Sequence, residues 1–238
     1  MSKPAKLALG IAAFAAIFAE AARRAAFSSP LRLLFAWVAL SCAIAGFAYA
    51  ANRPDLFGKR AGRLDRLRVA LLLPYLLAFR LACWIMRTWR RTPALSRVTP
   101  ELWVGGRIDA DDLPCDDPVV LDLVCEFDEP EAIRSLPGYR CVPVLDGHHP
   151  PDEEAFVALL DELAEVPGPV VVHCESGRGR APTAAALLLL RRGVVRETAD
   201  AIALVARGRP WTKLTATDRA FLERITGRMR EPGRPGWD

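Results

Sequence analysis

The chain has 238 residues, of which 52% are hydrophobic, and a formal net charge of +4. This small total conceals a sharp division, because residues 1–100 carry a net charge of +13 and the remainder carries −9. A nucleic-acid-binding domain would hold its basic residues on the folded part of the chain, among aromatic side chains, so this distribution excludes nucleic acid as a partner.

Two apolar segments open the chain. Leu7–Ala22 is apolar except for Glu20, and Leu33–Ala51 runs for nineteen residues without a charge, close to the ~20 residues that cross a bilayer. We therefore expect residues 1–66 to form two transmembrane helices in a hairpin, followed by a basic loop. Two alternatives remain open: a buried helical hairpin in a soluble protein and, for the first segment, a cleaved signal peptide.

A third apolar stretch, Val69–Met86, contains Pro74, Arg80 and Trp84 and is followed by Arg87, Trp89, Arg90 and Arg91. This composition suits a helix lying in the membrane interface better than a third span. Residues 67–98 are thus expected to be an amphipathic or interfacial helix with a linker. If this stretch did cross the bilayer, everything after it would lie on the opposite side.

Basic residues indicate the orientation. Three of them (Arg23, Arg24, Arg32) lie between the first two segments, and six follow the second (Arg53, Lys59, Arg60, Arg63, Arg66, Arg68). Loops rich in Lys and Arg stay inside, so the N-terminus and the rest of the chain are expected to face the cytoplasm as part of a multi-pass membrane protein. Each such residue near the surface contributes roughly 1 kcal/mol of attraction to anionic lipid.

Strand-like and helix-like segments alternate from residue 99 to 228. Val119–Phe127 and Tyr139–Leu145 have the composition of strands, whereas Glu153–Val166 carries its apolar residues on one helical face. Such alternation predicts an α/β domain with a central, mostly parallel sheet flanked by helices. Residues 229–238 are rich in proline and glycine and are expected to form a flexible tail.

The most informative segment is PVVVHCESGRGRAPT, residues 169–183. Val170–Val172 predicts a buried strand and Ala181–Leu190 a helix, so Cys174 lies on the turn between them. Backbone N–H groups and the helix N-terminus in such a turn favour a bound dianion and a thiolate. Arg180 can reach back with a fork of donors that matches phosphate oxygens. The pattern predicts that the cysteine attacks a phosphate that the arginine holds.

This segment resembles the HC-x5-R signature of the protein tyrosine phosphatase superfamily, which here runs from His173 to Arg180. The resemblance implies a dual-specificity-phosphatase-like domain over residues 99–228, with Cys174 as nucleophile. Arg180 and the loop residues would then hold the phosphate; those residues are Glu175, Ser176, Gly177, Arg178 and Gly179. By the same resemblance, His173 supports the thiolate. Ala181 stands where the family usually has a hydroxyl that helps the thiolate leave, which bears on hydrolysis of the phosphoenzyme.

Such an enzyme also needs an acid for the leaving oxygen. Asp146 is the candidate, because it follows the Tyr139–Leu145 strand and resembles the V-P-V-x-D acid of the dual-specificity branch. Asp152 is the rival, although its place before Glu153 and Glu154 is typical of a helix N-cap. The neighbouring His148 and His149 are expected to be solvated.

The six cysteines show no CxxC pair, and a catalytic thiolate needs a reducing compartment. No cofactor and no metal site are expected.

The substrate stays open between two phosphomonoesters. One is a phosphorylated protein, as for dual-specificity and tyrosine phosphatases. The other is a phospholipid headgroup, of a phosphatidylglycerophosphate or a phosphoinositide, because Arg178 adds a charge to the loop and the membrane is expected nearby. A catalytically silent adaptor that binds phosphorylated partners is a third interpretation. The presence of both Cys174 and Asp146 argues against it, since binding needs neither a nucleophile nor an acid.

Overall fold

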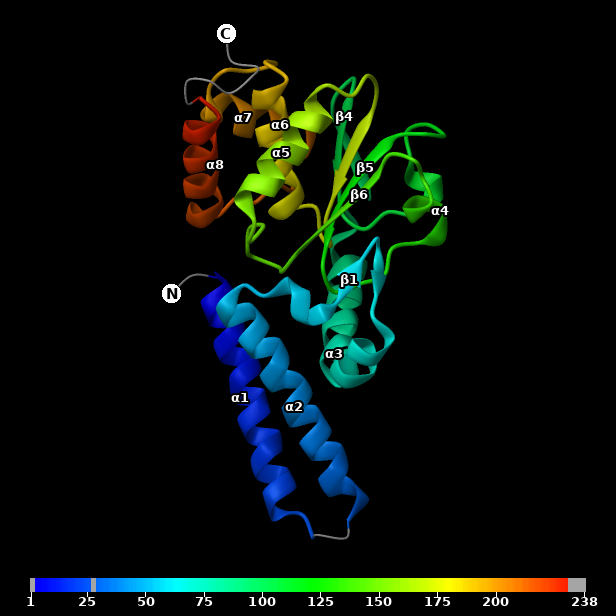
Figure 1. Cartoon of the computed structure of the whole chain (residues 1–238), viewed down its shortest axis with the longest axis vertical. Coiled ribbons are helices and arrows are strands. Elements are labelled where there is room, and N and C mark those ends of the chain that lie inside the picture. Colours follow the sequence, from blue (N-terminus) through cyan, green and yellow to red (C-terminus); the bar gives the residue numbers. More distant parts are fainter. Residues whose placement is uncertain (1–2, 27–28, 231–238) are drawn as a thin grey trace. The chain divides into compact units, whose positions relative to one another are not determined.

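The computed structural model describes residues 3–26 and 29–230, which fall into two compact units (Figure 1). The first unit is built from Met1–Arg91, Cys125–Asp128 and Leu145–His148, and the second from the remaining segments. The division predicted from sequence, at residues 66, 98 and 228, stays a prediction. The structure adds that two short segments of 99–228 pack with the N-terminal helices. The predicted tail lies, from residue 231 on, outside the described residues.

The first unit is mainly helical. Its elements are α1 (Lys3–Arg24), α2 (Pro30–Ala51), η1 (Pro54–Phe57), β1 (Lys59–Arg60), β2 (Arg63–Leu64) and α3 (Arg66–Arg90). Pro30 at the first helical position and the left-handed Asn52 after the last define the ends of α2. By length and composition α1, α2 and α3 could each cross a membrane. Helix α3, predicted to lie in the membrane interface, is therefore long and apolar enough to span it, like the two predicted spans.

Pro74 interrupts the backbone hydrogen bonds of α3, and side chains of α2 replace them. Tyr75 N–H donates to Ser41 Oγ at 3.1 Å, and Trp37 Nε1 donates to the Leu71 carbonyl at 3.1 Å. Groups freed by a proline must find partners where water is excluded. These two bonds therefore join α2 to α3 at the point where α3 would otherwise be weakest.

The second unit is an α/β sandwich. Its strands are β3 (Leu95–Thr99), β4 (Leu102–Gly105), β5 (Val119–Val124), β6 (Tyr139–Val144) and β7 (Val170–His173). Its helices are η2 (Ala110–Asp112), α4 (Glu131–Arg134), α5 (Glu153–Ala164), α6 (Arg180–Arg191), α7 (Thr198–Gly208) and α8 (Ala216–Met229). The sheet has the order β3-β4-β7-β5-β6 and is parallel except for β3, which confirms the predicted fold class.

The central strand β7 shows how alternation builds two cores. Val170 and Val172 join the cluster formed with α5, α6, α7 and α8, whereas Val171 joins a smaller cluster with Ile133 of α4. Figure 1 shows α5 to α8 gathered on one side of the sheet and α4 on the other. Helix α6 is buried from Arg180 to Leu190. Its N-terminus is thereby held at the carboxyl end of β7.

Candidate active site

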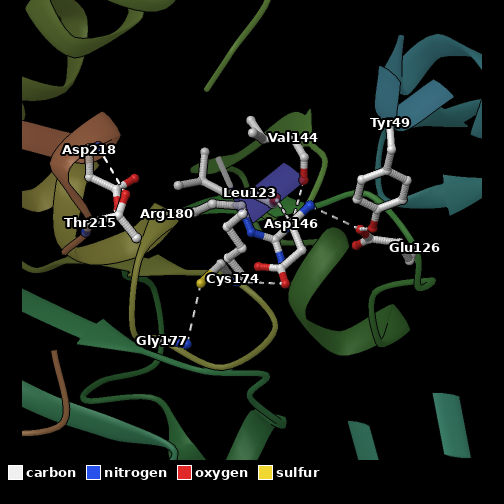
Figure 2. Close-up of polar contacts among 11 residues, drawn as sticks. Tyr49, Leu123, Glu126, Val144, Asp146, Cys174, Gly177, Arg180, Thr215 and Asp218 are labelled. Atoms are coloured by element: carbon white, nitrogen blue, oxygen red, sulfur yellow. Dashed lines mark hydrogen bonds and ion pairs between the residues drawn. The ribbon is translucent and has the colours of Figure 1, made fainter. Parts of the chain in front are cut away.

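The loop between β7 and α6 places Cys174 at the carboxyl end of the central strand. The thiol is 1% exposed, and Gly177 N–H donates to Cys174 Sγ at 3.3 Å (Figure 2). Gly177 has a positive φ of 63°, and a Cβ there would lie 2.4 Å from the backbone carbon of Gly105. Only glycine fits this position, because both the backbone conformation and the space exclude a side chain.

Four consecutive carbonyls of this loop accept hydrogen bonds from donors outside it. Arg107 N–H donates to the Glu175 carbonyl at 3.0 Å, and Lys213 N–H donates to the Arg178 carbonyl at 2.8 Å. The Arg209 side chain donates to the carbonyls of Ser176 and Gly177 between them. In a planar trans peptide the N–H points opposite to the C=O. The N–H groups of residues 176–179 are therefore turned toward the interior of the loop, as the contact of Gly177 with sulfur shows.

Arg180 begins α6 and is buried. Its Nη1 donates to the carbonyls of Leu123, at 3.3 Å, and of Val144, near the carboxyl ends of β5 and β6 (Figure 2). These bonds fix the guanidinium by one edge beside the loop that holds Cys174. Predicted residues His173 to Arg180 are thus brought together in one unit around one turn, with the donors that a phosphate requires.

His173 lies beneath the loop between two buried carboxylates. Its Nε2 is 3.8 Å from Asp122 Oδ1 and 3.6 Å from Glu129 Oε1. Tyr139 hydroxyl donates to Asp122 Oδ2 at 2.6 Å, and Val124 N–H donates to Asp122 Oδ1 at 2.7 Å. Burial, together with the charge of Asp122, raises the pKa of the Tyr139 phenol far above its usual range, which keeps this donor protonated.

The same three side chains form a group that could hold a metal ion, since their ligand atoms all lie within 4.8 Å of one another. Sequence spacing gave no sign of this group, because Asp122, Glu129 and His173 come from three different segments. The absence of a metal site stays a prediction. Their contacts suit another role, in which two carboxylates and a tyrosine orient the imidazole next to Cys174.

Arg209, directly after α7, is a buried contact of the Cys174 loop that sequence reasoning missed. It is 1% exposed and donates only to neutral oxygens among the described residues. The acceptors, with distances, are the carbonyls of Gly177 (2.7 Å), Ser176 (3.5 Å), Val104 (3.2 Å) and Pro93 (3.3 Å), and Ser96 Oγ (3.0 Å). Burial lowers the pKa of the Arg209 guanidinium, and the negative charge of Cys174 acts in the opposite direction. Arg209 thus clamps the loop and places a buried positive charge close enough to Cys174 to interact with it electrostatically.

Asp146 lies two residues beyond Val144 and belongs to the first unit. Its carboxylate Oδ2 is 2.9 Å from Lys3 Nζ, and its backbone N–H donates to Glu126 Oε1 at 3.3 Å. Its role as the acid stays a prediction. The rival Asp152 accepts a hydrogen bond from Ala155 N–H at 2.9 Å and begins α5, which confirms that it is an N-cap.

The two histidines of this region are packed rather than solvated, so that expectation was wrong. The His149 ring stacks on Phe221, with centroids 4.1 Å apart, and its Nε2 is 3.8 Å from Asp218 Oδ1. The His148 ring lies 6.0 Å from that of Tyr49. Phe221 is buried in the core of the second unit. Proline and glycine around these histidines suggested an open loop, but aromatic partners distant in sequence cover them.

Comparisons with known proteins agree with this site. Residues 132–224 match a family model described as the Swiss Army Knife protein, DSP-PTPase phosphatase domain, and this range contains Asp146, Cys174, Arg180 and Arg209. The comparison with curated proteins found no match.

Solved structures are similar over somewhat more than half of the chain. A mutant form of Tk-PTP is 20% identical with a TM-score of 0.50, covering 58% of this chain and 97% of that one. A mouse putative dual specificity phosphatase complexed with zinc tungstate is 22% identical with a TM-score of 0.48, covering 58% and 90%. PTPMT1 in complex with PI(5)P is 15% identical with a TM-score of 0.47, covering 57% and 96%. Residues 132–224 of this chain thus match a DSP-PTPase phosphatase domain, and the mutant form of Tk-PTP shares the fold.

Proposed function

We propose that the chain is a membrane-anchored cysteine phosphatase of the dual-specificity or tyrosine protein phosphatase type, with its catalytic domain in the cytoplasm. The observation that carries the activity is the loop of residues 174–180. Its four outward carbonyls turn the amides toward Cys174, while Arg180 stands beside it. Preorganised donors of this kind are aimed where negative charge develops in the transition state.

In the first step, the Cys174 thiolate attacks phosphorus, so that an S–P bond forms as the P–O bond of the ester breaks. Asp146 donates a proton to the leaving oxygen, and Arg180 with the loop amides neutralises the three other phosphate oxygens. His173 and the buried Arg209 favour the thiolate by their position and charge. No cofactor takes part in this step.

In the second step, water attacks the phosphocysteine while Asp146, now a carboxylate, accepts its proton. The S–P bond breaks, inorganic phosphate leaves and the thiolate is restored. Ala181 is buried at the start of α6 and offers no hydroxyl to the departing sulfur. We therefore expect hydrolysis of the phosphocysteine to be the slower step for substrates with good leaving groups.

Membrane anchoring is supported by the apolar helices α1 and α2, with α3 in the membrane interface, and by the basic residues that follow α2. These helices expose large apolar side chains, among them Phe14, Ile17, Leu40 and Phe47. A soluble helical hairpin would bury such residues. The basic loop then indicates the cytoplasmic side by the positive-inside rule.

A phospholipid headgroup phosphatase is the second candidate. The observation that favours it is an apolar groove of the first unit, lined by α1 and α2 and by His148, two residues beyond Asp146. A groove of this composition, next to the loop of residues 145–148 that holds Asp146, could receive an acyl chain of a membrane lipid. Arg178 would add positive charge for a headgroup with more than one phosphate.

The deciding experiment is phosphate release by the full chain in detergent micelles. The substrates are a phosphotyrosine peptide and micellar lipids, among them phosphatidylglycerophosphate and a phosphoinositide, and Cys174→Ser is the blank. Faster release from the peptide supports the protein phosphatase, and faster release from a lipid supports the second candidate. Cys174→Ser should lose turnover by more than about 10⁴-fold while still binding phosphate. Turnover by Cys174→Ser, or none by the unaltered chain, would contradict the mechanism, and the latter result would favour a silent adaptor.

A further inference from the structure

The acid loop, residues 145–148, packs within the first unit rather than with the strand that leads into it. Leu145 is fully buried in a cluster that includes Ala45 and Ala48 of α2 and Leu72 and Leu76 of α3. The segment that holds Asp146 is therefore placed by the apolar helices. Its position in the chain, directly after β6, gives no hint of this.

Glu126 connects the loop to α2 through hydrogen bonds. Its carboxylate is buried, and Oε1 accepts from the Tyr49 hydroxyl at 2.8 Å and from the Asp146 backbone N–H at 3.3 Å (Figure 2). Oε2 accepts from Cys125 N–H at 3.3 Å. A single carboxylate thus joins a helix side chain to the backbone of the candidate acid.

A second contact reaches the carboxylate of Asp146 itself. Lys3 Nζ, at the start of α1, lies 2.9 Å from Asp146 Oδ2, with the two side chains 54% and 31% exposed. Ion pairs as exposed as this one contribute little. Tyr49 is only 1% exposed, and a buried hydrogen bond to a carboxylate is costly to lose. Tyr49 should therefore matter more than Lys3.

We infer that the N-terminal hairpin of α1 and α2 positions the proposed acid, Asp146, for proton transfer. Tyr49 acts on it through Glu126, and Lys3 acts on it directly. This inference rests on the proposed role of Asp146 as the acid. Neither residue is a catalytic residue, because Tyr49 and Lys3 position the group that transfers the proton. The hairpin then does more than tether the enzyme.

The chemistry gives this role a distinctive signature. A leaving oxygen that is a strong base needs a proton in the transition state, whereas a weakly basic one departs without help. Misplacing Asp146 should thus slow turnover of substrates with poor leaving groups and spare those with good ones. A general loss of folding would lower both equally.

The test measures kcat and KM for a series of aryl phosphates with the full chain in detergent micelles. Tyr49→Phe should lower kcat by about tenfold for the poorest leaving group, with less than about twofold change for the best and an unchanged KM. Glu126→Gln should reproduce this pattern. Lys3→Met should lower the same kcat by about twofold to threefold, and Lys3→Arg should restore it. Lys6→Met, which removes an exposed charge of the same helix, should leave all rates unchanged.

Two results would overturn the inference. One is a fall in kcat for Tyr49→Phe and Glu126→Gln that is equal across the leaving-group series, which would indicate a purely structural role. The other is no change in either variant. Asp146→Ala is measured alongside them. If it depends on the leaving group and Tyr49→Phe does not, only the positioning role fails; if Asp146→Ala shows no such dependence, the proposed acid fails too.

Discussion

The phosphate loop and the acid loop are held in place by different units of the molecule. The loop of residues 174–180 is fixed from inside the α/β unit, by backbone donors of Arg107 and Lys213 and by the buried side chain of Arg209. The acid loop of residues 145–148 is fixed by the N-terminal helices, through Glu126, Tyr49 and Lys3. In the proposed mechanism, phosphate binding therefore depends on the α/β unit alone, whereas proton transfer depends on the N-terminal helices as well.

Asp146→Ala should distinguish the roles of the two loops by the largest effect on rate. Because the acid assists only departure of the leaving group, kcat should fall by about 10²–10⁴-fold for poorly leaving alcohols and change little for good leaving groups. Rates across an aryl phosphate series test this, with phosphate binding as the second readout. Asp152→Ala is the matched control, since it removes an N-cap and costs about 1 kcal/mol of stability without changing leaving-group dependence. The opposite pattern for these two aspartates would reverse the assignment.

Arg209→Lys probes the phosphate loop. Lysine keeps the charge but loses the planar fork, so the carbonyls of Ser176 and Gly177 lose donors in a buried setting. We expect the free energy of unfolding to fall by about 2 kcal/mol and kcat/KM to fall by about tenfold for every leaving group, together with weaker phosphate binding. Arg207→Lys, at an exposed arginine two residues earlier, is the control. It should leave the free energy of unfolding and kcat/KM unchanged. A leaving-group-dependent loss in Arg209→Lys would show that the phosphate loop and the acid loop are not held independently.

Ala181→Ser addresses the second chemical step. A hydroxyl at this buried position would assist departure of the thiolate, so the rate of phosphocysteine hydrolysis should rise by about threefold to tenfold. The burst of product seen before the steady state, with a good leaving group, should shrink in proportion. A burst of unchanged size would show that Ala181 does not limit this step.

Tyr139→Phe should have the smallest effect on catalysis, because Tyr139 reaches the phosphate loop only indirectly, through Asp122 and His173. The folded protein raises the pKa of this phenol, whereas the unfolded chain releases the proton near pH 10. Stability from this group is therefore complete below about pH 10 and lost above it, at no more than about 1.4 kcal/mol per pH unit. Denaturant unfolding between pH 8 and pH 11 should show a shallower alkaline decline in Tyr139→Phe. An identical decline in both proteins would contradict the raised pKa.

The sequence predicted the local parts of the site and missed the distant ones. Val170–Val172, the turn and the helix after it could be read from composition and spacing, because neighbouring residues determine each. Asp152 was recognised as a cap for the same reason.

Arg209 was missed because an arginine near a proline normally suggests a solvated turn, and nothing nearby in sequence predicts its burial. The contacts of Tyr49 with Glu126, and of His173 with Asp122 and Glu129, also join residues far apart along the chain. Hydrophobic patterns report which faces are buried, but not which polar groups meet there. The same limit explains why His148 and His149 were expected to be solvated.

The packing of Leu145 and Cys125 among the N-terminal helices has a practical consequence for anyone who truncates the chain. A fragment that starts near residue 92 would keep every residue of the phosphate loop, yet it would strip the apolar cover from both residues and remove Tyr49 from Glu126. Such a fragment is expected to bind phosphate analogues as the intact protein does while under-reporting its turnover. Inhibitor screens run on the excised domain would find compounds that bind the phosphate loop and miss compounds that act through the N-terminal helices.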